Sequence, residues 1–168
     1  DNQGLITVTG GKLTTFRLIA LDALKLAAPY LGINVDDQRG AIFSPPNSGV
    51  APQGMSAGVF ARLVSRLGIH TRAFLTEMPA AELTPIADTQ VLLAELRWAC
   101  RHEQVVHLDD LLLRRVRLGL LLPQGCIDAI PSLDAILADE LGWSAEQIAA
   151  ERVRYSDIWQ RYYYLPTA

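Results

Sequence analysis

From residue 55 onward, apolar side chains recur every three or four positions, and this periodicity restricts the fold more than any other feature of the sequence. Four segments show it: 55–68, 86–105, 108–122 and 131–142. Each has the pattern of a helix that turns one face toward a core. A further helix is predicted from Ser144, whose spacing to Gln147 is that of a capping box, to about residue 164. We therefore predict a helical bundle over residues 55–168.

The stretch LITVTGGKLTTFR near the start of the sequence has a different pattern. Residues 5–9 are β-branched and apolar and end at a glycine pair, which predicts a short strand. After Lys12 the spacing becomes helical and continues to Gly32. A single strand cannot pair its own backbone groups, so we expect its partner strands in polypeptide further upstream. The first letters, DNQG, also indicate a piece of a longer protein, and residues 1–9 of the piece alone should fray or pair with another copy.

Composition divides the chain into three parts. Residues 1–32 contain the predicted strand, turn and helix. Residues 33–54 are rich in glycine, proline, asparagine and serine, which predicts a connecting loop, and residues 55–168 form the helical domain. The predicted fold class is therefore mainly α, with a helical bundle of about five to six helices preceded by one N-terminal strand.

The composition argues against several classes of function. The net charge of −3 provides no basic surface for nucleic acid, and there is no apolar run of about 18 residues to span a membrane. Cys100 and Cys126 are too few for a disulfide framework and lack metal spacing, which favours a reduced cytoplasmic setting and inert thiols. His102 and His107 are five positions apart, whereas the zinc-binding helix motif has its histidines four apart, so no metal site is predicted.

The glycine pair offers a place where a ligand can approach the backbone. Gly10 and Gly11 carry no side chain, and the first amides of the helix that follows are unpaired and favour negative charge. Lys12 adds a positive charge. The spacing fits neither a Walker loop nor a dinucleotide-binding fingerprint. From the residues alone, a plain tight turn and a ligand-binding turn remain equal alternatives.

The stretch GLITVTGGKLTTFR, followed by ALDALKLA, resembles the end of the flavin domain in FAD-dependent glycerol-3-phosphate dehydrogenases. The stretch LDDLLLRRVRLGLLL resembles a helix of that family's C-terminal helical domain, and FLTEMP and ELRWACRHEQVVHLDD fit between them. The similarity covers most of the chain and is weakest at residues 33–54. It implies that residues 1–32 are the tail of the FAD-binding domain. The residues that it implies as flavin contacts, at the pyrimidine edge of the ring, are Gly10, Gly11, Lys12, Leu13 and Thr14.

The same resemblance implies that the parent protein is a bacterial flavoprotein. It would oxidise sn-glycerol 3-phosphate to dihydroxyacetone phosphate and pass the electrons through FAD to a quinone. Its other implied partner is the N-terminal flavin domain of the same chain, and its implied location is cytoplasmic, with peripheral contact to the cytoplasmic face of the inner membrane. The catalytic and substrate-binding residues would lie upstream. We therefore expect this piece alone to bind no FAD and to be inactive.

Two alternatives stay open. The helical domain also fits an interaction or assembly module that docks a partner subunit or a membrane, and the parent also fits a related amino-acid-oxidase-type flavoenzyme. Arg114, Arg115 and Arg117 bear on the first alternative. We expect them to pair with carboxylates such as Asp109 and Asp110, or with the flavin domain, whereas exposed and unpaired arginines would favour docking.

The aromatic residues are expected in the core. Trp98, Trp143 and Trp159 each fall within a predicted helix, where packing against the bundle is the usual role. The stretch WQRYYYLP, residues 159–166, is likewise expected to be buried against the bundle. Its exposure would instead make it a contact for a membrane interface or a partner.

Overall fold

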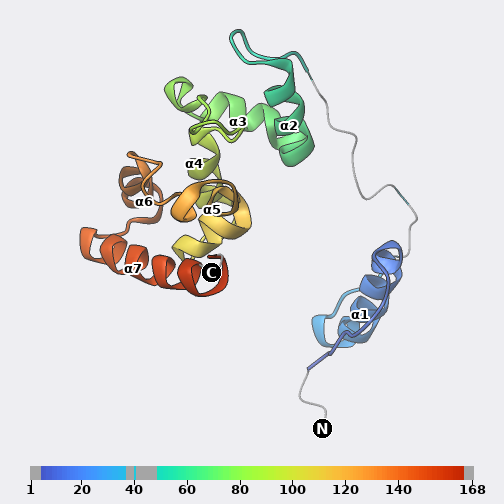
Figure 1. The fold of residues 1–168 in the computed structure, drawn as a ribbon. Helices are drawn as coiled ribbons and strands as arrows, with labels where there is room; N and C mark the ends of the chain where they lie inside the picture. The colour runs from blue at the N-terminus through green and yellow to red at the C-terminus, as the bar shows by residue number, and fades with distance from the viewer. Residues whose placement is uncertain (1–4, 37–39, 41–48, 165–168) are drawn as a thin grey trace. The chain divides into compact units, whose positions relative to one another are not determined.

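The computed structural model describes residues 5–36, 40 and 49–164, and the chain divides into two compact units, residues 1–44 and residues 45–168 (Figure 1). In its described residues the chain is mainly α-helical, with seven α-helices. The prediction of a helical bundle is confirmed. There is one α-helix more than the upper limit of the expected five to six, because Thr71–Glu77 form a helix that was not predicted.

The first unit contains the helical turn η1 (Leu13–Thr15) followed by α1 (Phe16–Leu31). The helix ends at Gly32, whose φ of 65° lies in the left-handed region that glycine adopts without strain. This end of the helix was predicted. Among the described residues of α1 only Leu21 is buried.

The predicted strand at residues 5–9 is not formed in this chain: residues 5–12 carry no regular secondary structure, which agrees with the expectation that this stretch frays without partner strands. Leu5 is 88% exposed and Val8 is 53% exposed. A strand is held by hydrogen bonds to a neighbouring strand, and no described segment provides one. The β-branched composition of the stretch is therefore not sufficient to form the strand here. Residues 1–4 lie outside the described residues.

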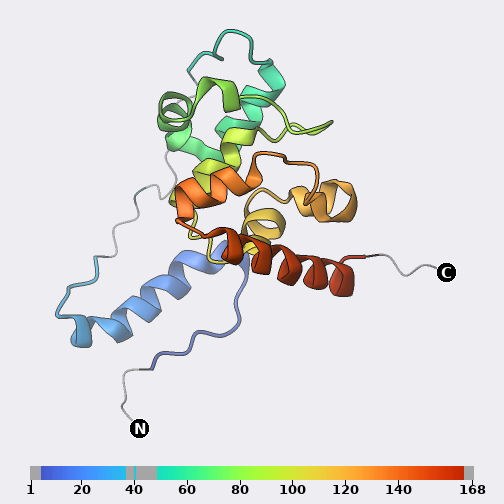
Figure 2. The ribbon, with the colours of Figure 1, turned by 90° about the vertical axis from the view of Figure 1, so that its left-hand side faces the viewer.

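The second unit contains the remaining helices (Figures 1 and 2). Its α-helices are α2 (Ala57–Leu67), α3 (Thr71–Glu77), α4 (Leu93–His102), α5 (Leu118–Leu121), α6 (Leu133–Leu141) and α7 (Ala145–Tyr162). Between them lie the short 3₁₀ turns η2 (Gly68–His70), η3 (Ala80–Glu82) and η5 (Pro123–Cys126), and the π-helical segment η4 (Asp110–Arg115). The predicted cap of the last helix is present, since the Ser144 hydroxyl accepts a hydrogen bond of 3.2 Å from the amide of Gln147.

The segment predicted as one helix over 86–105 is helical only in its second half. Before α4 the chain forms a tight antiparallel turn, in which the amide of Ile86 donates to the carbonyl of Val91 at 2.8 Å. The helix then begins where the Glu95 carboxylate accepts a hydrogen bond of 2.8 Å from the amide of Leu92. A carboxylate at this position satisfies one of the unpaired amides of a helix start, and that local bond fixes where α4 begins.

The segment predicted as one helix over 108–122 is also divided. It contains the π-helical segment η4, then Arg117 with a left-handed φ of 59°, and then the single turn α5. Leu111, Leu112 and Leu113 are all buried. Three consecutive residues span more than one face of a helix, so this segment is surrounded by the core on several sides, unlike an amphipathic surface helix.

Two hydrophobic clusters form the core, and α4 contributes to both. Ala94 and Trp98 of α4 pack in the smaller cluster with α2 and α3, whereas Leu96, Ala99 and Cys100 pack in the larger cluster with η4, α6 and α7. Figures 1 and 2 both show α4 between these two groups of helices. Trp98 and Trp143 are buried and Trp159 is half-buried, so the prediction that the tryptophans pack in the core is confirmed.

Candidate functional site

The glycine pair of the first unit adopts a backbone conformation that suits glycine. Gly10 has a φ of 79° and Gly11 a φ of 99°, which side-chain-bearing residues rarely adopt. A Cβ on Gly11 would lie 2.2 Å from Cδ1 of Ile19, whereas a Cβ on Gly10 would meet nothing within 4 Å. Gly11 therefore suits both this backbone conformation and the close approach of Ile19 in α1, and the space beside Gly10 is open.

A reciprocal pair of hydrogen bonds shapes the start of the helix. The amide of Lys12 donates to the Thr15 hydroxyl at 3.1 Å, and that hydroxyl donates to the Lys12 carbonyl at 2.8 Å. The amide of Lys12 is therefore engaged within the turn. The amides of Leu13 and Thr14, which are the first of the helical segment, make no hydrogen bond to the part of the chain that the structure describes. Sequence reasoning missed Thr15, although its position three residues after the cap is typical of such a bond.

The five predicted site residues form one continuous exposed segment. Gly10, Gly11, Lys12 and Thr14 are exposed, and Leu13 is 90% exposed. The segment combines two free amides, a flexible ammonium group and the positive end of a helix dipole, all of which favour an electron-rich or anionic partner. An exposed leucine beside these groups provides an apolar surface for a flat ring.

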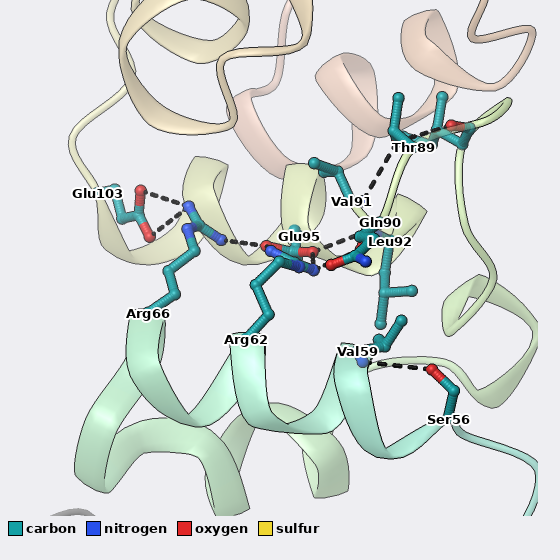
Figure 3. A network of polar contacts seen from close by, with 11 residues as sticks. Ser56, Val59, Arg62, Arg66, Thr89, Gln90, Val91, Leu92, Glu95 and Glu103 are labelled. Carbon is teal, nitrogen blue, oxygen red and sulfur yellow. Dashed lines mark hydrogen bonds and ion pairs between the residues drawn. The ribbon is translucent and has the colours of Figure 1, made fainter. Parts of the chain in front are cut away.

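The second unit contains a buried carboxylate held by two arginines (Figure 3). The Glu95 side chain is 1% exposed and receives hydrogen bonds from Arg62 and Arg66 of α2, that from Arg66 measuring 2.8 Å. Arg66 also contacts Glu103 at 3.0 Å, and Arg62 donates to the carbonyl of Gln90 at 2.6 Å. Because every oxygen of Glu95 is engaged, this network holds α2 against the start of α4 and offers no free acid or base.

A second buried carboxylate, Asp109, lies between Arg114 and Arg154. Burial by itself would raise the pKa of Asp109, but hydrogen bonds from the two guanidinium groups outweigh burial and lower it. Arg114 also pairs with Asp110 at 3.0 Å, as the spacing of four residues predicted. The carboxylate is therefore held ionised between two cations.

The three arginines of this segment behave differently. Arg114 pairs with carboxylates, as predicted, although its side chain is 53% exposed. The other two make no ion pair with a described carboxylate, and their pairing with the flavin domain stays a prediction. Arg115 donates to the carbonyl of Glu103 at 2.6 Å, and Arg117 is exposed and makes no ion pair with any described residue.

The histidines and cysteines are engaged in packing and hydrogen bonding. The His102 ring lies 4.0 Å from that of Trp98, centroid to centroid, and Nδ1 of His107 lies 2.9 Å from Glu151. The described residues contain no group of three side chains placed to hold a metal ion. Burial raises the pKa of both Cys100 and Cys126 to about 12, in agreement with the expectation of inert thiols.

The aromatic C-terminal end of α7 is exposed, and the expectation that it is buried is wrong for its described residues. Tyr162 is 67% exposed, Tyr163 45% and Tyr164 52%, whereas residues 165 and 166 lie outside the described part. The buried residues of α7 are Ile148 and Tyr155, so the buried face of this helix does not extend to the last tyrosines. No described helix is long and apolar enough to cross a membrane.

The family model and the relatives that match this chain all belong to one group of enzymes. A family model described as the C-terminal domain of alpha-glycerophosphate oxidase matches residues 22–148. A glycerol-3-phosphate dehydrogenase of Mycobacterium leprae is 29% identical over 91% of this chain and 29% of its own length. Glycerol-3-phosphate dehydrogenase 1 of Mycobacterium tuberculosis is 36% identical over 70% of this chain and 24% of its own length.

An alpha-glycerophosphate oxidase of Lactococcus lactis is 30% identical over 94% of this chain and 30% of its own length. The chain thus spans less than a third of the length of the relatives it matches. No solved structure matches it significantly. The family match begins at residue 22, after the glycine turn, so it bears on the helical domain and not on residues 10–14.

Proposed function

The chain belongs to the family of C-terminal domains of alpha-glycerophosphate oxidase, and we propose that it is the C-terminal part of an FAD-dependent oxidoreductase that converts sn-glycerol 3-phosphate to dihydroxyacetone phosphate. The observation that carries this proposal is the match of one family model to residues 22–148, together with relatives from two bacterial genera that act on glycerol phosphate by name. These relatives are more than three times longer than the chain. The proposal therefore assigns the flavin-binding fold and the substrate site to polypeptide upstream of these residues.

Within this proposal, residues 1–32 are the tail of the FAD-binding domain, 33–54 a connection and 55–168 the helical domain. The turn Gly10–Thr14 forms the wall beside the pyrimidine edge of the flavin. The described geometry fits such a group, because the amides of Leu13 and Thr14 are free and the space beside Gly10 is open. When bound, FAD supplies the acceptor for the hydride that leaves the substrate carbon.

In this proposal, the residues of the chain stabilise negative charge on the flavin and hold the turn in place. The free amides of Leu13 and Thr14 and the ammonium group of Lys12 stabilise negative charge at the ring edge, as donors at a helix start do for anions. Gly11 holds the turn close to α1, since any side chain there would meet Ile19. The proposal leaves the group that takes the substrate proton to upstream residues. The quinone as final electron acceptor is part of the same proposal.

A substitution that removes a backbone amide tests the proposed contact between the turn and the flavin edge. Leu13→Pro removes one of the two free amides, and proline suits this position because it is the first of the helical segment and Lys12 before it is extended, with φ −105° and ψ 153°. Leu13→Ala is the matched control, because it shortens the side chain and keeps the amide. In the longer protein, Leu13→Pro should lower the flavin midpoint potential and weaken FAD binding about tenfold, whereas Leu13→Ala, which loses only apolar contact with the ring, should keep the potential and weaken FAD binding much less. Equal behaviour of the two variants would reject the amide contact.

A second role, docking to a membrane surface or a partner, is supported by an exposed patch beside α5. Trp159 of α7 donates to the Gly119 carbonyl of α5 at 2.9 Å, so the end of α7 lies next to α5. The exposed residues there are Arg117, Leu120, Leu121, Tyr162, Tyr163 and Tyr164. Leucines, tyrosines and an unpaired arginine together suit the interface of an anionic membrane.

Vesicle sedimentation tests this second role. The chain should sediment with vesicles of phosphatidylglycerol and phosphatidylethanolamine, and less with phosphatidylcholine alone, because the cation contributes about 1 kcal/mol at an anionic surface. Replacing Leu120 and Leu121 by serine should reduce binding. Failure of the wild-type chain to sediment with either vesicle would remove the peripheral membrane contact from the proposal and leave the flavin assignment untouched.

A further inference from the structure

A pocket of about 650 Å³ lies between the C-terminal half of α7 and the turn at η5. Its polar and aromatic lining consists of Gln124, Asp128, Ser156, Trp159, Gln160 and Tyr164. The volume falls within the range of small-molecule sites in proteins, about 300–1,000 Å³. Its lining residues all belong to the second unit, and none belongs to the glycine turn.

Hydrogen bonds fix the walls of this pocket. The indole N–H of Trp159 donates to the Gly119 carbonyl at 2.9 Å, and the hydroxyl of Tyr155 donates to the Gly125 carbonyl at 2.7 Å. The Trp159 and Tyr164 rings meet edge to face, with centroids 5.5 Å apart and an interplanar angle of 67°. The Trp159 and Tyr164 rings therefore form two walls of the pocket at a steep angle to each other. The Trp159 ring is held in place by the hydrogen bond from its own indole N–H.

The backbone on the opposite side of the pocket is strained. Gln124, Gly125 and Cys126 have φ values of 51°, 70° and 61°. Two of these three consecutive left-handed residues bear side chains, which is an uncommon arrangement. Strained backbone of this kind is concentrated at binding sites. Here it carries the chain around the pocket and places Gln124 in the lining.

The polar side chains of the lining are available to bind a ligand. Within the described part of the chain, the side chains of Gln124, Asp128, Ser156 and Gln160 make no hydrogen bond and no ion pair. Asp134 differs, because it is paired with Arg152 at 2.6 Å. Asp128 carries the one formal charge in the lining, and no lysine, arginine or histidine is among the described lining residues. The pocket therefore combines a negative charge, three neutral polar side chains and two electron-rich rings.

We propose that this pocket binds a small organic ammonium ion. The Asp128 carboxylate balances the charge, and the faces of Trp159 and Tyr164 attract a cation through their ring electrons. The oxygens of Gln124, Gln160 and Ser156 accept hydrogen bonds from the N–H or O–H groups of such a ligand. An anion such as glycerol 3-phosphate would meet the carboxylate with no cation among the described lining residues, and the neighbouring Arg152, which donates to the carbonyl of Ile127 at 3.3 Å, is already paired with Asp134. The site therefore goes beyond the proposed oxidoreductase function and stands independently of it.

Nuclear magnetic resonance of the ¹⁵N-labelled chain tests this proposal with choline chloride as the probe. The three tryptophans give three indole N–H signals, of which that of Trp159 is assigned with Trp159→Phe, and those of Trp98 and Trp143 serve as internal references. The expected result is a saturable shift of the Trp159 signal, with a Kd on the order of 1 mM. The neutral isostere 3,3-dimethyl-1-butanol should bind at least tenfold more weakly, because it lacks the positive charge.

Two charge-neutralising variants complete the experiment. Asp128→Asn should weaken choline binding about tenfold or more, since it removes the only charge of the lining. Asp157→Asn is the matched control, because Asp157 is an exposed carboxylate of α7, the helix that carries Ser156 and Trp159, and does not line the pocket. It should leave the Kd unchanged. The proposal is overturned if choline shifts no signal, if the isostere binds equally well, or if the two variants have the same effect.

Discussion

The hydroxyl of Tyr155 donates a hydrogen bond of 2.7 Å to the carbonyl of Gly125, and the same oxygen lies 2.2 Å from where a Cβ on Gly119 would stand. Tyr155 is fully buried. Tyr155 of α7 thus packs against Gly119 of α5 and Gly125 of η5. This contact holds α7 on the bundle. The packing requires the Tyr155 hydroxyl and also requires that positions 119 and 125 be glycine, without a side chain.

The first prediction concerns this contact. Gly119→Ala should lower the free energy of unfolding of the chain by about 1–3 kcal/mol, because the new methyl group overlaps the Tyr155 hydroxyl and a methyl of Leu113. Tyr155→Phe should lower it by about 1–3 kcal/mol, since the Gly125 carbonyl loses its buried donor. The double variant should be more stable than the sum of the two predicts, because the phenylalanine leaves room for the methyl group.

Urea unfolding followed by circular dichroism measures these values. Gly58→Ala is the control, since a Cβ at this helical position in α2 meets nothing within 4 Å. It should leave stability unchanged or raise it by up to about 1 kcal/mol. Strict additivity of Gly119→Ala and Tyr155→Phe would show that the two groups do not compete for the same space.

The second prediction concerns Glu95. Its replacement by glutamine should cost about 3–5 kcal/mol, because Arg62 and Arg66 would lose the carboxylate that balances them in a partly buried position. Glu77→Gln, at a side chain that is 49% exposed, should change stability by less than about 0.5 kcal/mol. Thermal unfolding of both variants measures the difference. Equal Tm values for the two would mean that the Glu95 network contributes nothing to holding α2 on α4.

The third prediction is a dependence on pH. Hydrogen bonds from Arg101 and Arg97 lower the pKa of Glu140, so its ionised form is stabilised by folding. The resulting stability is present above the pKa of the unfolded chain, about 4.3 for glutamate, and is lost as the pH falls through the lower folded value. Asp109, whose pKa is also lowered, acts in the same direction.

The Tm of the chain should therefore fall as the pH is lowered from about 5. In Glu140→Gln the Tm should already be lower at pH 7, and it should depend less on pH below about 5. Asp157→Asn, at an exposed side chain that makes no ion pair with any described residue, serves as the control and should keep the wild-type profile. Differential scanning calorimetry across this range measures both profiles. An unchanged acid slope in Glu140→Gln would contradict the stabilising role of these ion pairs.

The fourth prediction concerns the thiols. Cys100 and Cys126 should not react with Ellman's reagent in the folded chain at neutral pH, because both are buried and burial raises the pKa of each to about 12. Both should react within seconds after unfolding in guanidinium chloride. Rapid reaction of either thiol in the native chain would show that the larger hydrophobic cluster opens readily.

Much of the helical domain is predictable because its signals are local. The amphipathic spacing of α2, the left-handed Gly32 after α1 and the Ser144 cap of α7 each depend on a few neighbouring residues. The misses depend on distant contacts. Arg117 is left-handed although nothing in its own chemistry favours that conformation, so the break between η4 and α5 is not visible in the sequence.

The same reasoning applies to the candidate site. The five residues of the turn could be named from the sequence, but the bond between the Lys12 amide and the Thr15 hydroxyl, which leaves only two free amides, required the structure. The strand at residues 5–9 was predicted from composition, yet strand formation depends on a partner that the described chain does not contain.

The most direct test of the proposed function is anaerobic reduction of the flavin in the longer protein that contains this chain. The protein should be purified with bound FAD, and sn-glycerol 3-phosphate should bleach the oxidised flavin absorbance, whereas glycerol or an amino acid should not. The 168-residue chain alone should retain no FAD and oxidise no substrate. A longer protein without flavin, or a bound flavin that an amino acid reduces and glycerol 3-phosphate does not, would contradict the assignment.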